Sequence, residues 1–71
     1  MNPIIVGKNV EKLMLENNVT LKQLSKEMHI GEAELLNKIE GKQEFCVCDV
    51  LSITKFLELS NEEVSNIFFK K

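Results

Sequence analysis

The most reactive side chains of this sequence are one histidine, His29, and two cysteines, Cys46 and Cys48. A structural zinc site needs four ligands, and a catalytic nucleophile needs an adjacent base that a third group orients. Neither set can be assembled from one histidine, two cysteines and three glycines. We therefore expect no metal site, no cofactor and no enzymatic activity, and we assign both cysteines to ordinary packing.

A second group of side chains has the chemistry of nucleic-acid contacts. The amide of Asn37 can form paired hydrogen bonds with adenine, while Lys22 and Lys42 can each reach a phosphate. Leu36 follows an inward residue and is expected to point outward, where it can contact a thymine methyl group or a protein partner. For each of these residues the alternative is an ordinary surface side chain.

Composition limits how such contacts could be made. The basic residues are nine lysines with no arginine, and eleven acids bring the net charge to −2. The molecule as a whole therefore does not attract nucleic acid, and it lacks the side chain that reads guanine in a bidentate manner. The opening residues show neither a signal-peptide pattern nor a membrane span, so we expect a cytoplasmic protein.

Hydrophobic periodicity predicts a single all-α domain over residues 1–71, built from five short helices. Residues 1–7 are expected to form an N-terminal arm that ends at Gly7, before a helix over residues 8–17. Two helices over residues 20–39 follow, then one through Leu57 and a last one after Ser60. The apolar residues expected inside are Leu13, Leu24, Met28, Ile30, Leu35, Val50, Leu51, Ile53 and Leu57.

Local signals mark several helix ends. Thr20 with Gln23 and Ser60 with Glu63 have the spacing of capping boxes. Asn18 can adopt the left-handed conformation that ends a helix, His29 lies at a turn, and Gly41 stops the helix before it.

From about Val10 to Ile67 the sequence resembles the lambda repressor and Cro family, the XRE-type helix-turn-helix proteins of phages and bacteria. The pattern that carries the resemblance is a capping Thr, a Leu, an apolar turn residue, a further apolar residue and a Gly, here Thr20, Leu24, Ile30, Leu35 and Gly41. A later apolar helix followed by a Ser-capped one corresponds to Leu51, Ile53, Leu57, Leu59, Ser60 and Glu63.

The resemblance implies a lambda-repressor-like DNA-binding domain with its helix-turn-helix over residues 20–39, whose second helix enters the major groove. It places base-reading positions on Glu32 and Ala33, with Asn37 one turn later. The residues that it implies for the DNA-facing surface are Lys22, Gly31, Glu32, Ala33, Leu36, Asn37, Lys38 and Lys42.

The departures from the family pattern lie on this surface. Leu21 stands where relatives often carry Gln, and Glu32 can accept from cytosine but repels phosphate. Between Thr20 and Lys42 four lysines are balanced by four glutamates, so DNA affinity is expected to be weak unless a dimer forms.

Two functions fit these observations. The first is a phage- or prophage-type transcriptional regulator that binds duplex DNA as a homodimer. The second is a protein-interaction module on the same fold, for example an antirepressor-like partner of another regulator. Asn37 and the flanking lysines favour the first, whereas the missing arginines, the acids Glu32 and Glu34, and the apolar Leu21 and Leu36 favour the second.

Overall fold

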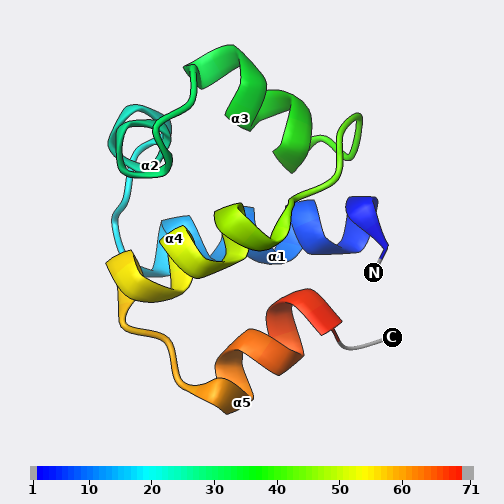
Figure 1. The fold of residues 1–71 in the computed structure, drawn as a ribbon, viewed down its shortest axis with the longest axis vertical. Coiled ribbons are helices and arrows are strands. Elements are labelled where there is room, and N and C mark those ends of the chain that lie inside the picture. The colour runs from blue at the N-terminus through cyan, green and yellow to red at the C-terminus, as the bar shows by residue number, and fades with distance from the viewer. Residues whose placement is uncertain (1, 70–71) are drawn as a thin grey trace.

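The computed structural model describes residues 2–69, and all of the regular secondary structure in that range is helical (Figure 1). Its elements are α1 (Pro3–Glu16), α2 (Leu21–Met28), α3 (Glu32–Ile39), α4 (Val47–Leu57), α5 (Asn61–Val64) and a π-helical turn, η1 (Ser65–Phe69). The five expected α-helices are confirmed. Within these residues no helix combines the length and the apolar character that crossing a membrane requires.

Each helix start is fixed by local hydrogen bonds where the sequence offers a capping side chain. Asn2 Oδ1 accepts hydrogen bonds from the backbone N–H groups of Ile4 and Ile5 at the start of α1. The capping boxes expected for Thr20 with Gln23 and for Ser60 with Glu63 are both formed. These boxes satisfy backbone donors that have no partner within the helix.

The first four helices all end in the same way, with a left-handed residue followed by a six-to-one hydrogen bond. The left-handed residues are Asn18, His29, Gly41 and Glu58, with φ between 52° and 81°. The N–H of the following residue donates to a carbonyl five positions earlier, for example Ile30 to Ser25 and Lys42 to Asn37. The turns predicted at Asn18, His29 and Gly41 are confirmed, while Glu58 carries no sequence signal for this conformation.

The expected N-terminal arm over residues 1–7 is wrong for the part that the structure describes. Pro3 is the first residue of α1, where its fixed φ and missing N–H are tolerated. Gly7 lies inside the helix and does not break it. A Cβ at Gly7 would lie 2.0 Å from the carbonyl oxygen of Ile39, so glycine lets α1 touch the backbone at the end of α3.

The core lies between α1, α2, α3 and α4 and is closed by Phe68 of η1. Most of the expected core residues are buried: Leu13, Leu24, Met28, Leu35, Val50 and Ile53. Ile30 and Leu57 are only partly buried. Leu51 is 63% exposed, which corrects its expected place inside: α4 turns Val50 and Ile53 inward, and Leu51 points away from them.

Two aromatic rings that were not among the expected core residues complete the core. Phe45, in the segment before α4, and Phe68 are 3% and 1% exposed, and their ring centroids lie 6.2 Å apart in an edge-to-face arrangement. Phe68 points inward, whereas the adjacent Phe69 is 60% exposed.

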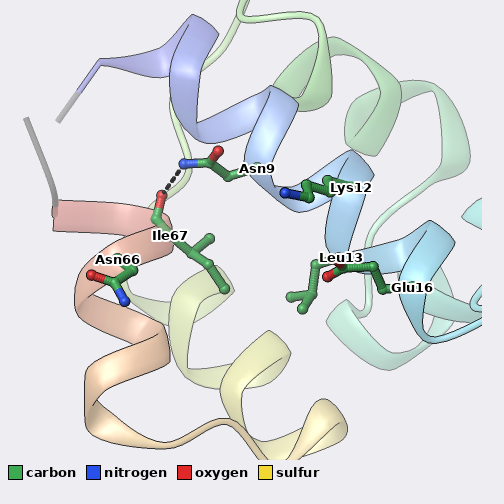
Figure 2. Close-up of a pocket in the computed structure, with 6 residues that line it drawn as sticks. All are labelled: Asn9, Lys12, Leu13, Glu16, Asn66 and Ile67. Atoms are coloured by element: carbon green, nitrogen blue, oxygen red, sulfur yellow. Dashed lines mark hydrogen bonds between the residues drawn. The ribbon is translucent and has the colours of Figure 1, made fainter.

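The π-helical turn is held against the first helix by a side chain. Asn9 Nδ2 of α1 donates a hydrogen bond of 3.0 Å to the carbonyl oxygen of Ile67 (Figure 2). Beside this bond is a small hollow of about 200 Å³, lined by Asn9, Lys12, Leu13, Glu16, Asn66 and Ile67. The bond fixes where η1 lies, and therefore where Phe68 and Phe69 point.

The close contact at Gly7 leads to a testable expectation. Alanine favours a helix over glycine by about 1 kcal/mol, but its Cβ would overlap the Ile39 carbonyl. Because that atom belongs to the backbone, relief requires α1 and α3 to separate. We expect Gly7→Ala to lower the free energy of unfolding by about 1–3 kcal/mol, measured by urea denaturation.

Gly31→Ser is the matched control, because a Cβ at Gly31 would meet nothing within 4 Å. Gly31 is the N-cap of α3, where a serine is favourable, so stability should hold or rise by a few tenths of a kcal/mol. Equal stability of wild type and Gly7→Ala would contradict the close contact.

Candidate nucleic-acid interface

The turn between α2 and α3 is fixed by core contacts from both helices. Leu24 of α2 and Leu35 of α3 are both completely buried, and the partly buried Ile30 packs against the same core. The left-handed His29 reverses the chain between them. Because both inner faces are anchored, the outer face of α3 has a defined position on the surface.

That outer face is open to solvent along its length. Four predicted site residues lie on it: Glu32, Ala33, Leu36 and Asn37. The spacing of one and four positions places them on one side of the helix, and Leu36 is 43% exposed. The structure therefore brings these four predicted residues together and leaves them accessible.

Gly31 and Lys22 lie at the edges of this face. Gly31 is exposed and extended at the N-cap of α3, where no side chain caps the helix. Lys22 is exposed in the first turn of α2. Glu32 and Glu34 occupy the first turn of α3, where they interact favourably with the helix dipole and reduce the pull of that helix end on a phosphate.

Lys42 is held in a fixed relation to Asn37 by the end of α3. Its backbone N–H donates to the Asn37 carbonyl at 2.9 Å, and Gly41 supplies the left-handed turn between them with φ of 81°. The Lys42 side chain is 69% exposed, and its Nζ lies 3.3 Å from Glu40 Oε1. A phosphate would have to compete with that carboxylate for the ammonium group.

The expected DNA contact of Lys38 is wrong. Lys38 is 4% exposed, and its ammonium group forms an ion pair with the carboxylate of Asp49, which is equally buried. Asp49 Oδ2 also accepts a hydrogen bond of 2.9 Å from the backbone N–H of Cys46. Lys38 therefore ties α3 to the start of α4 and is not available to a ligand.

Sequence reasoning missed Asp49, although a signal was present. Asp49 lies three residues after Cys46, the N-cap of α4, which is the spacing of a capping box. It directly precedes the inward Val50. A capping carboxylate next to a core position, together with a lysine facing inward from α3, would have indicated the buried pair.

The pKa of Asp49 is shifted by two opposing effects. Burial alone would raise the pKa of this carboxyl group. Hydrogen bonds from the Lys38 ammonium group and from Cys46, together with the positive charge of Lys38, outweigh burial and hold the pKa below its ordinary value. Asp49 is therefore ionised at neutral pH, and the pair carries no net charge.

Because Lys38 is buried, the exposed face around α3 is slightly acidic. Between Thr20 and Lys42 three exposed lysines, Lys22, Lys26 and Lys42, stand against four exposed glutamates, Glu27, Glu32, Glu34 and Glu40. Within residues 2–69, the part of the chain that the structure describes, no group of three or more histidine, cysteine or acidic side chains could hold a metal ion. The surface offers hydrogen bonding through Asn37, apolar contact through Leu36 and few cations.

Comparison with protein-family models, with curated proteins and with solved structures found no match for this chain. The resemblance to the repressor family therefore depends on the residues named above.

The buried pair predicts a large effect from removing one partner. In Lys38→Met the Asp49 carboxylate stays buried without its cation, so we expect a loss of about 3–5 kcal/mol in the free energy of unfolding. The double variant Lys38→Met/Asp49→Leu removes both charges and should recover most of that stability. Denaturant unfolding of the wild type and both variants gives the comparison. A single variant as stable as the wild type would contradict the pairing.

The lowered pKa also sets the sign of an acid effect. Because the folded pKa lies below that of the unfolded chain, the ionised carboxylate adds stability that is complete above about pH 4. That stability is lost as the pH falls through the lowered folded pKa. The double variant should therefore show a weaker dependence of stability on pH below about 4 than the wild type, measured by thermal unfolding across a pH series. Identical pH dependence would show that Asp49 contributes nothing to acid unfolding.

Proposed function

We propose that this protein is a small repressor-like transcriptional regulator of the phage or prophage type, which binds duplex DNA through the outer face of α3. The observation that supports this most is the exposure of Glu32, Ala33, Leu36 and Asn37 along one face, above a completely buried Leu35. A helix anchored on one side and free on the other fits the major groove.

The charges around α3 imply that one copy binds weakly. Cations that contact phosphates provide most non-specific affinity, and here Lys38 is buried while Lys42 lies beside Glu40. Two copies on adjacent half-sites would double the phosphate contacts and make the second binding step intramolecular. The proposal therefore includes a homodimer on DNA.

Substitutions on α3 and after it separate base reading from phosphate contact. Asn37→Ala should cost roughly 1–3 kcal/mol on the preferred site and relax its sequence preference. Lys42→Ala should weaken all sequences similarly and lower the salt dependence by about 0.9 per protomer. Glu32→Gln should raise non-specific affinity, since it removes a negative charge that faces phosphate. Fluorescence anisotropy on selected and random duplexes, over a salt series, measures all three.

The absence of salt-sensitive binding near 50 mM salt, for both the wild type and Glu32→Gln, would refute DNA binding. The second candidate is then a protein-interaction module, which the exposed Leu36 and the excess of acidic side chains around α3 favour. Under that function a regulator partner would lose more affinity from Leu36→Ala than from Asn37→Ala, because apolar anchors carry such interfaces. The partner would be identified by affinity capture with the wild type, with Leu36→Ala as the control.

A further inference from the structure

An apolar concavity lies between α4 and the segment formed by α5 and η1, away from α3. We call it the α4–η1 groove. It has a volume of about 530 Å³ and is lined by Phe45, Cys46, Val47, Val50, Leu51, Thr54, Asn61, Val64 and Phe69. Every one of these nine residues is uncharged, in a chain of which 28% is charged.

The side chains at the mouth of the groove are the most exposed apolar residues of this part of the molecule. Val47, Leu51 and Phe69 are 74%, 63% and 60% exposed. Val47 and Leu51 are four residues apart and therefore lie on one face of α4. A contiguous exposed apolar surface of this kind marks an interaction site more often than isolated surface leucines do.

The π-helical turn puts Phe69 at this mouth. In a π-helix the hydrogen bonds join residues five apart, so residues five apart lie about one turn from each other. Val64 and Phe69 consequently both line the groove, while Phe68 fills the core beside Phe45. The hydrogen bond from Asn9 to Ile67 keeps the turn in place.

We propose that the α4–η1 groove is occupied by the same groove of a second copy of this chain. A two-fold dimer requires one patch that is complementary to itself. This patch carries both a projecting ring, Phe69, and a recess floored by Phe45 and Val50, which are 3% and 7% exposed. In the dimer the Phe69 ring of each copy enters the recess of the other.

Charge supports a second copy as the occupant. Each chain has a net charge of −2, so two copies repel each other wherever acidic surfaces meet. The described residues that line the groove carry no charge, so the groove itself adds no repulsion between two copies. A strongly basic partner, by contrast, would find no carboxylate in the groove lining to pair with.

The size of the patch sets the strength of the dimer. A standard interface buries about 800 Å² on each partner, whereas the largest apolar patch of a typical monomer covers about 300–600 Å². Because the exposed apolar side chains at this mouth are few, the dimer should be weak and reversible, with a Kd on the order of 10 μM or higher.

The groove and the α3 face can be occupied at the same time. None of the residues that line the groove belongs to α3, and α3 and α5 lie at opposite ends of the longest axis, with α4 between them (Figure 1). The inference supplies the dimer surface for the DNA-binding function proposed above. The test of the dimer surface uses no DNA, so the dimer surface and the DNA-binding function can be refuted separately.

The experiment is sedimentation equilibrium of the full chain from about 10 μM to about 1 mM. The wild type should shift reversibly from monomer toward dimer across this range. Leu51→Glu would bury a charge in the interface, and Phe69→Ala would remove the ring that enters the recess. Each should raise Kd at least about tenfold. Both residues are exposed, so the melting temperature at low concentration should change little.

Leu15→Glu is the matched control, since Leu15 is a 75% exposed leucine on α1 and does not line the groove. It adds the same charge as Leu51→Glu and should leave Kd unchanged. As a second measurement, alkylation of the groove residue Cys46 by iodoacetamide should slow as protein concentration rises.

A wild type that stays monomeric up to about 1 mM would overturn the proposal and leave the groove to a different partner. A dimer that Leu15→Glu weakens as much as Leu51→Glu does, or whose formation leaves Cys46 alkylation unchanged, would place the interface elsewhere and overturn it as well.

Discussion

The buried ion pair of Lys38 and Asp49 is the contact on which the two surfaces of this molecule depend. Lys38 belongs to α3 and Asp49 to the first turn of α4, so the pair fixes the helix that presents Asn37 and Leu36 relative to the helix that presents Val47 and Leu51. Burying two charges costs solvation energy that their attraction returns only with good geometry and further hydrogen bonds. The Cys46 N–H provides one such bond. The pair therefore specifies one arrangement of α3 against α4 more than it adds net stability.

A second constraint on α3 comes from the first helix. At Gly7 the backbone of α1 touches the carbonyl group of Ile39, and at Gly41 a Cβ would lie 2.8 Å from the side chain of Ile4. Both contacts lie at the C-terminal end of α3, next to Lys38. The end of α3 is thus held from two directions while its outer face stays free.

The helix termini show how this small domain accepts local strain. His29 and Glu58 adopt left-handed conformations at φ of 59° and 52°, which cost non-glycine residues roughly 1–2 kcal/mol each. Each of these residues precedes a six-to-one hydrogen bond that satisfies a helix carbonyl. The helices on either side of each turn pack on one shared core, and this packing offsets the backbone cost.

The sequence by itself determined the five helices and several of their borders, because these depend on local chemistry. Capping boxes at Thr20 and Ser60 are contacts over three residues, and the inward stripes of α2 and α3 follow from the helical period. The exposed face of α3, with Glu32, Ala33, Leu36 and Asn37, followed from the same period. Only the tertiary structure decided the fate of Lys38, Gly7, Leu51 and Phe45. Lys38 is buried because Asp49, eleven residues later, lies opposite it, and position 7 needs a glycine because the backbone of Ile39 lies against it. Leu51 is exposed because the core needs only one side of α4, and Phe45 is buried because Phe68 returns to meet it. These outcomes depend on how elements distant in the chain pack against one another. Only the Lys38 pair had a local signal, which was the capping-box spacing of Asp49 after Cys46.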